Sequence, residues 1–168
     1  MIIAFLLSII PIIFFGLKNS DDLNFHVSRI YGIVQGLKNG NFPVFIYPNY
    51  NYNYGYASPI FYCDFFFYIP ALLNLIGIKL FTTYKIFLIL INASILCSMY
   101  FVIYKLTNSK KTASISSSLY LLSSYKIIDM FKRAAVGELF GFIFFPFVVY
   151  GLYEIIYGNY KNGKYYVR

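Results

Sequence analysis

Two polar stretches carry side chains whose types and spacing could do chemistry, and the first lies near the N-terminus. Asp22 and His26 are four residues apart and Arg29 follows three residues later, so on a helix the three side chains share one face. One interpretation is an acidic centre at a helix start, with a histidine partner and a nearby cation. The alternative is that Asp21 and Asp22 begin the helix, where acidic side chains are favoured, while His26 faces lipid headgroups.

The second stretch is "SSYKIIDMFKRAAVGE", residues 123–138, which concentrates charged side chains around Asp129. Lys132 and Arg133 could hold a phosphate, the arginine through two parallel hydrogen bonds. Alternatively, they belong to a charge run that anchors two flanking spans. Glu138 enters an apolar run and therefore needs a partner, for which Lys132 and Arg133 are the candidates.

Several common classes of site are excluded by what the sequence lacks. One His and two Cys cannot build a closed zinc site, which typically takes four ligands. The patterns GxSxG, GxxxxGK[ST] and HExxH, which mark hydrolases, phosphate-binding loops and metalloproteases, do not occur. The remaining chemistry, acids and bases beside apolar segments, suits a lipid-linked phosphate compound at a bilayer face.

The composition indicates that these side chains lie beside a membrane. Of 168 residues, 60% are hydrophobic and 12% are charged, against about 45–50% and 25% in soluble domains. The net charge of +8 comes from short basic clusters next to apolar segments, which suits anionic headgroups and topology control. The sequence contains no continuous basic face, so we predict no nucleic-acid partner.

Five apolar segments must position the polar stretches: residues 2–17, 60–78, 84–104, 112–124 and 137–157. The first has no basic start, so we predict a short membrane helix bent at Pro11 rather than a secretory signal. The third and fifth are predicted to cross the bilayer. The second carries Asp64 and Pro70, which are easier to place at the interface than in lipid.

Positive charge favours four spans over five. If residues 60–78 lie at the interface, six basic residues fall on the inner side: Lys105, Lys110, Lys111, Lys161, Lys164 and Arg168. We therefore predict an all-α integral membrane protein with four transmembrane helices, with residues 18–83 and 125–136 on the outer side. The alternative has five spans, with residues 60–78 crossing.

The outer loop of residues 18–83 contains an amphipathic helix by its periodicity. Apolar side chains recur at helical spacing up to Gly40: Leu23, Val27, Ile30, Val34 and Leu37. The pattern predicts a helix that lies on the membrane surface.

A tyrosine-rich run, "YPNYNYNYGYASPIFY", follows at residues 47–62. Pro48, Gly55 and Pro59 punctuate it, which favours a defined, turn-rich loop over disorder. Its tyrosines, Tyr47 and Tyr56 among them, suit either the headgroup layer or the face of a sugar ring.

Three stretches of the sequence together resemble a known family: "DLNFHVSRIYGIVQGLKNGNFPVFIYPN", "GYASPIFYCDFFFYIPALL" and "YKIIDMFKRAAVGE". The family is a group of bacterial membrane proteins named 6-pyruvoyl-tetrahydropterin synthase-related, and the likeness covers residues 18–157. That family is similar in pattern to the multi-span GT-C glycosyltransferases, including YfhO-type proteins. The pterin synthase itself implies a zinc site built from several His, and this chain has one.

The resemblance implies a multi-pass glycosyltransferase of the bacterial cytoplasmic membrane, using a polyprenyl-phosphate sugar at the extracytoplasmic face. Asp22 matches the acid that GT-C enzymes place in their first outer loop, as a general base or as a ligand of a divalent metal ion. His26 and Arg29 would orient that acid. Asp129 matches a second acid in the next outer loop.

The resemblance also implies a substrate site and a longer protein. The residues that would face the donor are Lys132, Arg133, Glu138, Tyr47 and Tyr56. Members of that family are several times longer, so residues 1–168 are predicted to form a single membrane domain, the N-terminal part of a protein whose further spans complete it. Two other functions fit the residues: a non-catalytic module that binds or transports lipid, and a fragment without activity of its own.

Overall fold

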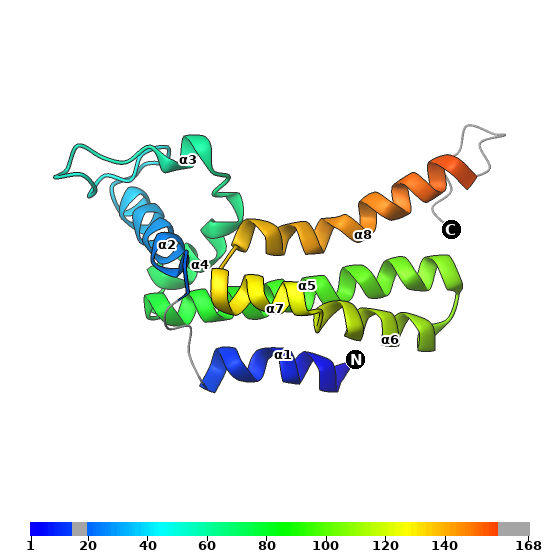
Figure 1. Ribbon diagram of the computed structural model, residues 1–168. Coiled ribbons are helices and arrows are strands. Elements are labelled where there is room, and N and C mark those ends of the chain that lie inside the picture. Colours follow the sequence, from blue (N-terminus) through cyan, green and yellow to red (C-terminus); the bar gives the residue numbers. More distant parts are fainter. Residues whose placement is uncertain (15–19, 158–168) are drawn as a thin grey trace. The chain divides into compact units, whose positions relative to one another are not determined.

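The computed structural model describes residues 1–14 and 20–157, and within them every regular element is a helix (Figure 1). In chain order these are α1 (Ile2–Phe14), α2 (Leu23–Lys38), α3 (Ser58–Phe61), the 3-10 helix η1 (Phe65–Phe67), α4 (Tyr68–Leu75), α5 (Leu80–Thr107), α6 (Lys110–Leu121), α7 (Ser124–Ile128), the π-helix η2 (Asp129–Arg133) and α8 (Val136–Tyr157). The predicted all-α class is confirmed for these residues. The chain divides into two compact units: unit 1 contains α1 and the chain from Leu90 onward, and unit 2 contains the residues between α1 and Ile89.

Two helices are long and apolar enough to cross a membrane, and they coincide with the two segments predicted to do so. α5 has 28 residues and α8 has 22. At 1.5 Å per residue they extend about 42 and 33 Å, against a hydrocarbon core of about 30 Å. The residues of α5 up to Ile89 belong to unit 2. Unit 2 is therefore built on one end of a helix that is long enough to span a bilayer.

The first and fourth apolar segments form shorter helices. α1 and α6 have 13 and 12 residues, about 20 and 18 Å, and both expose apolar side chains such as Phe14 and Leu119. The predicted end of the first segment at Leu17 lies outside the described residues, as do three residues of the basic tail: Lys161, Lys164 and Arg168. Helix length thus supports two spans, and the predicted four are not confirmed.

Residues 60–78 do not form one helix. The chain folds there into the end of α3, then η1, then the eight-residue α4, and Gly77 follows with a φ of 100°. Eight helical residues reach only about 12 Å. Asp64 and Pro70 are both buried within unit 2. The segment therefore contains no helix long enough for the five-span alternative, and beside these buried residues it exposes Ile60, Phe61 and Ile76. The predicted interfacial position stays a prediction.

Helix α2 begins after Asp22 and ends in a Schellman motif. The Gly40 N–H donates to the Leu37 carbonyl and the Asn41 N–H donates to the Gly36 carbonyl, both at 3.0 Å, with Gly40 at a φ of 79°. Four residues of the apolar stripe are buried, on a helix that contacts α4 and η1: Leu23, Val27, Ile30 and Val34. The prediction that this stripe lies on the membrane is wrong, because the protein itself covers it.

The tyrosine-rich run forms a closed loop. Tyr47 and Tyr56 pair as an antiparallel bridge, with N–H to carbonyl distances of 2.9 and 3.1 Å. Between them Asn51, Tyr52 and Asn53 have φ values of 51, 57 and 71°, a left-handed conformation that Asn adopts more readily than most residues. The prediction of a defined loop is confirmed, and the asparagines have a conformational role in its turn.

Candidate functional site

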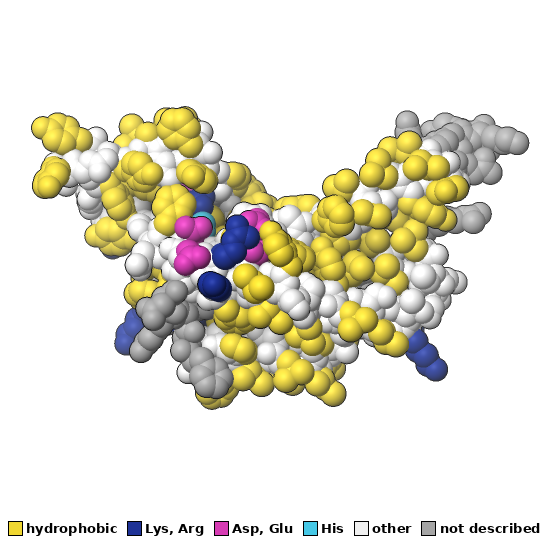
Figure 2. Space-filling view, viewed as in Figure 1, with side chains coloured by type: hydrophobic (Ala, Val, Ile, Leu, Met, Phe, Trp, Pro, Cys, Tyr) yellow, Lys and Arg dark blue, Asp and Glu magenta, His cyan; other side chains and the backbone are white. Residues whose placement is uncertain are grey.

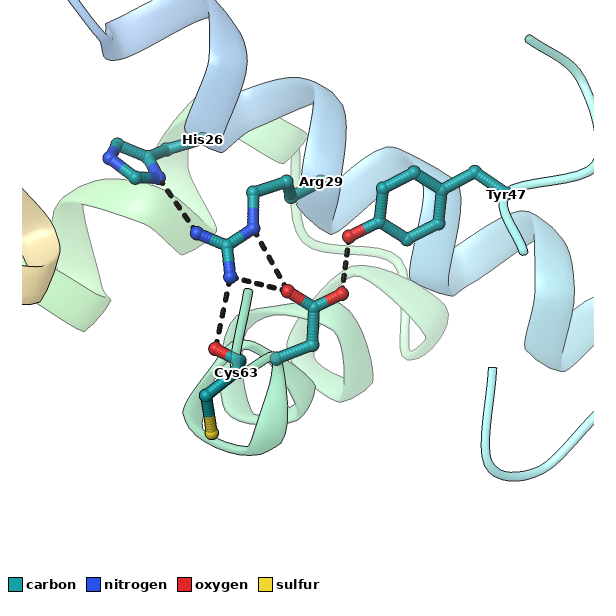
Figure 3. Close-up of polar contacts among 5 residues, drawn as sticks. His26, Arg29, Tyr47 and Cys63 are labelled. Carbon is teal, nitrogen blue, oxygen red and sulfur yellow. Dashed lines mark hydrogen bonds and ion pairs between the residues drawn. The ribbon is translucent and has the colours of Figure 1, made fainter. Parts of the chain in front are cut away.

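A buried network in unit 2 joins α2 to the residues before η1 (Figure 3). Arg29 Nε donates to Asp64 Oδ1 at 2.9 Å, and Arg29 Nη2 donates to the same oxygen and, at 3.0 Å, to the Cys63 carbonyl. The Tyr47 hydroxyl donates to Asp64 Oδ2. The side chains of Arg29 and Asp64 are each 5% exposed. The ion pair therefore lies in an interior where an unpaired charge would be costly.

Aromatic rings enclose the Arg29 guanidinium. Its Cζ atom lies 4.0 Å from the centroid of Phe67, 5.5 Å from that of Phe25 and 5.6 Å from that of Tyr62. Arg29 Nη1 is 3.3 Å from His26 Nδ1, and because arginine can only donate, Nδ1 is the acceptor. The His26 ring also stacks on Phe67, with centroids 5.4 Å apart. These contacts fix both basic side chains in place.

Tyr47 completes the network from the loop side. Burial and the hydrogen bond to Asp64 raise the pKa of the Tyr47 hydroxyl, so this group stays protonated and donates. Its ring lies against Gly32 of α2, where an added Cβ would sit 2.3 Å from the ring. Glycine at position 32 therefore permits the approach of the ring. With one cation and one anion, the Arg29–Asp64 pair is neutral as a whole.

A cavity of about 160 Å³ opens beside this network. Four rings and three polar side chains line it: Phe25, Tyr47, Tyr50, Tyr56, Ser28, Arg29 and Asn51. Because Asp64 balances the Arg29 charge, the lining offers ring faces and hydrogen-bonding groups without net charge. Such a lining suits a neutral polar ring better than an anion. Tyr47 and Tyr56, both predicted to bind substrate, belong to this cavity.

Asp22, the predicted catalytic acid, is exposed at the start of α2, and its side chain does not cap the helix. The prediction that Arg29 orients Asp22 is corrected, because the carboxylate partner of Arg29 is Asp64. In the sequence, Asp64 stands out only as a charge that fits poorly in lipid. The rule that an acid in an apolar segment needs a cation indicates that Asp64 has a partner, but it does not identify Arg29 as that partner.

Unit 1 holds a second cluster, in which Arg133 joins two acids. Its Nη1 donates to Asp129 Oδ1 at 2.6 Å and its Nη2 donates to Glu138 Oε1. The Tyr125 hydroxyl donates to the other oxygen of Glu138. The predicted partner of Glu138 is thus confirmed as Arg133, and hydrogen bonding to Glu138 raises the pKa of the guanidinium. Because two acids engage Arg133, the predicted phosphate contact rests mainly on Lys132, which is exposed.

Asp129 is the buried member of this cluster. Its side chain is 0% exposed, whereas that of Arg133 is 41% exposed. The second carboxylate oxygen of Asp129 has no hydrogen-bond partner among the described residues. Burial raises the pKa of Asp129, the Glu138 charge adds to this effect and Arg133 opposes it. The second acid that the resemblance implies at this position is therefore a buried carboxylate paired with Arg133, and its role stays a prediction.

Lys126 is a second buried cation in unit 1, and the sequence predicts no role for it. Its side chain is fully enclosed, its Nζ donates to Asn92 Oδ1, and Nζ lies 3.6 Å from the Met130 sulfur. Burial lowers the pKa of Lys126 to about 8. Nothing in the local sequence separates this lysine from the exposed Lys132, because its burial follows from helix packing.

Comparison of the chain with protein-family models, with curated proteins and with solved structures finds no match. Over residues 1–14 and 20–157, no three His, Cys, Asp or Glu side chains come together in a group that could hold a metal ion. The divalent ion that the resemblance implies stays a prediction. Within unit 2 the geometry brings His26, Arg29 and Tyr47 into one network around Asp64.

Proposed function

We propose that the chain is the N-terminal part of a GT-C-like membrane glycosyltransferase, and that the cavity of unit 2 holds a saccharide ring. The observation that carries the proposal is the cavity lining, a set of tyrosine faces and polar groups whose one cation, Arg29, is paired with Asp64. Unit 2 is built on the end of α5, which is long enough to cross a membrane. A sugar site in this position would serve a donor whose lipid part lies in the bilayer.

The chemistry of a sugar ring agrees with this lining. Pyranose rings present apolar C–H faces and hydroxyl edges, and the rings of Tyr50 and Tyr56 offer matching faces. Ser28 and Asn51 supply hydrogen-bonding groups at the same cavity. A phosphate would be bound less well, because the one cation of the lining, Arg29, is already paired.

In this proposal Asp22 is the general base of the transfer. The acceptor hydroxyl gives its proton to Asp22, its oxygen forms a bond to the anomeric carbon, and the polyprenyl phosphate leaves with the electrons of the broken bond. Asp22 is exposed, so an acceptor can reach it. Asp22 is seven positions before Arg29, which lines the cavity, and seven positions correspond to about 10 Å along a helix axis. Asp129 and Lys132 keep the roles that the resemblance implies, second acid and phosphate contact.

We also propose that the protein lies in the bacterial cytoplasmic membrane with four spans. α1 and α6 join α5 and α8 in this arrangement, with predicted spans at residues 2–17 and 112–124. The exposed apolar side chains of both short helices support this arrangement, Ile3 at 75% and Ile115 at 62% among them. Lipid would cover these surfaces.

Binding to the cavity is tested first. The purified chain in lipid nanodiscs is titrated with short-chain polyprenyl-phosphate monosaccharides and, separately, with free monosaccharides. We expect saturable binding that Tyr56→Leu weakens at least tenfold. Tyr54→Leu is the matched control, because Tyr54 is 91% exposed and lies outside the cavity lining. Absence of saturable binding, or equal weakening in both variants, would exclude the cavity as a sugar site.

Transfer is tested second, in membranes from cells that express the protein from its complete reading frame. Asp22→Asn should abolish sugar transfer and leave binding unchanged, whereas Asp21→Asn, the neighbouring control, should retain both. Normal transfer by Asp22→Asn would exclude the catalytic role. Sugar or lipid binding without any transfer by the unaltered protein would instead identify a non-catalytic lipid-binding module.

A further inference from the structure

The chain that follows α2 exposes large apolar side chains and carries no charge before Asp64. No Asp, Glu, Lys or Arg occurs between Lys38 and Asp64. The most exposed of its large side chains are Phe42, Tyr52, Tyr54 and Phe61, at 77, 98, 91 and 82%. Figure 2 shows hydrophobic side chains gathered over this part of unit 2, at the upper left, where Figure 1 has the cyan loop and α3. Residues 42–62 form this aromatic segment.

The aromatic segment is held in a fixed conformation, so the exposed rings are not a consequence of disorder. Val44 and Tyr47 are 3% and 1% exposed and anchor the segment to unit 2. The Val44 N–H donates to the Tyr68 hydroxyl at 2.8 Å, and the Tyr47–Tyr56 bridge closes the loop. The fold therefore displays this apolar surface, and a surface of this kind is expected to be covered by a partner.

Attachment to α5 indicates that the partner is a lipid bilayer. α5 has 28 residues, about 42 Å, and a hydrocarbon core takes up about 20 of them. Unit 2 includes the residues of α5 up to Ile89. Unit 2 consequently lies within a few helical turns of the membrane surface, where an apolar face can meet lipid.

The composition of the aromatic segment points to the headgroup layer in particular. Charged side chains are costly to insert into a bilayer, and this segment has none. Tyrosine places its ring among acyl chains and its hydroxyl in the polar layer, which is why it is enriched at membrane interfaces. The asparagines at the loop tip shape its left-handed turn and can bond to headgroups.

We propose that the aromatic segment inserts into the membrane interface, with Tyr52, Tyr54 and Phe61 in contact with lipid. The inference rests on the membrane location that is part of the proposed function, and it is independent of sugar transfer. Insertion would fix unit 2 at the bilayer by a second attachment besides α5. The mouth of a cavity that includes Tyr56 would then face lipid-linked molecules at the membrane surface.

The absence of Trp from the sequence makes a direct experiment possible. Single-Trp variants of the full chain are reconstituted in vesicles of neutral phospholipid that contains bromine at defined acyl positions. Tyr54→Trp and Phe61→Trp report on the aromatic segment. Phe145→Trp, at a position of α8 that is 62% exposed, reports on the hydrocarbon core. Lys38→Trp, at the exposed end of α2, reports on water.

We expect both segment variants to emit at shorter wavelength than Lys38→Trp, to be quenched by bromine near the headgroup, and to be protected from aqueous iodide. Iodide quenching equal to that of Lys38→Trp would overturn the inference, while lipid quenching of Phe145→Trp would leave the membrane location intact. Protection from both quenchers would also overturn it, because a protein surface would then cover the segment. Failure of lipids to quench Phe145→Trp would reject the membrane location as well.

Discussion

Breaking the buried Arg29–Asp64 pair should destabilise the protein strongly. Asp64→Asn preserves the shape of the side chain and leaves an arginine that is 5% exposed without a counter-ion. Removing one partner of a buried ion pair typically costs about 3–5 kcal/mol. The asparagine oxygen can still accept from Arg29, and its NH2 group can donate to the Tyr47 hydroxyl oxygen, which donates to Asp64 in the unaltered protein. We therefore expect a loss near the lower end, about 3 kcal/mol.

A double-mutant cycle separates the pair from its surroundings. Arg29→Met removes the cation, and a methionine can keep contact with the Phe67 ring that lies 4.0 Å from the arginine Cζ. Alone, this change leaves the Asp64 carboxylate buried without a cation. The double variant, Arg29→Met with Asp64→Asn, has neither charge. Its loss in the free energy of unfolding should therefore be smaller than the sum of the two single losses, by at least about 2 kcal/mol.

The assay is the free energy of unfolding of the full chain in detergent micelles, measured by denaturant titration and far-UV circular dichroism. Asp21→Asn serves as the control, because Asp21 is exposed and should change stability by less than about 0.5 kcal/mol. Single losses that add up in the double variant to within about 0.5 kcal/mol would refute the reasoning. If Arg29→Met left the free energy of unfolding unchanged but abolished sugar transfer, Arg29 would have a catalytic role instead of a structural one.

Two further predictions concern close packing and pH. Gly32→Ala should destabilise the protein by about 1–3 kcal/mol, since an added Cβ would lie 2.3 Å from the Tyr47 ring. The control is Gly141→Ala, which should be neutral or stabilising because the space around Gly141 is open. Equal melting temperatures of the two variants would contradict this account. Because the pKa of Lys126 falls from 10.5 to about 8 on folding, the unfolded chain binds more protons between these values, so stability should rise with pH through this window by roughly 3 kcal/mol. At pH 7, Lys126→Met should melt at a higher temperature than the unaltered protein. Between pH 8 and 10, the stability of the variant should not rise with pH. If the stability of the unaltered protein changed with pH as little as that of the variant, Lys126 would not be a buried lysine with a lowered pKa.

Features that depend on nearby residues could be predicted from the sequence. The two long apolar helices, α5 and α8, follow from the length of their apolar runs. The end of α2 at Gly40 follows from the left-handed conformation that glycine adopts easily. The Arg133–Glu138 pair joins residues five positions apart, so its partners could be named in advance. Each of these features is determined by residues that lie close to one another in the sequence.

Pairings between distant residues could not be predicted. Arg29 has two acids close by in sequence, Asp21 and Asp22, yet its partner is Asp64, 35 residues away. Proximity along a helix favours the near acids, and burial reverses the choice because a buried cation needs a carboxylate that is enclosed with it. The break in residues 60–78 delivers that carboxylate to α2, and no local pattern specifies where the break turns the chain.

The sequence by itself determined the helical class, the two long apolar helices, the defined tyrosine-rich loop and the acidic start of α2, because hydrophobic run length and backbone preference are local properties. Only the tertiary structure decided that the α2 stripe faces protein, that Lys126 is buried and that Tyr47 reaches Asp64. Those outcomes depend on which surfaces meet. Which surfaces pack together depends on the fit of their shapes and on the pairing of buried charges. Both are properties of the folded chain.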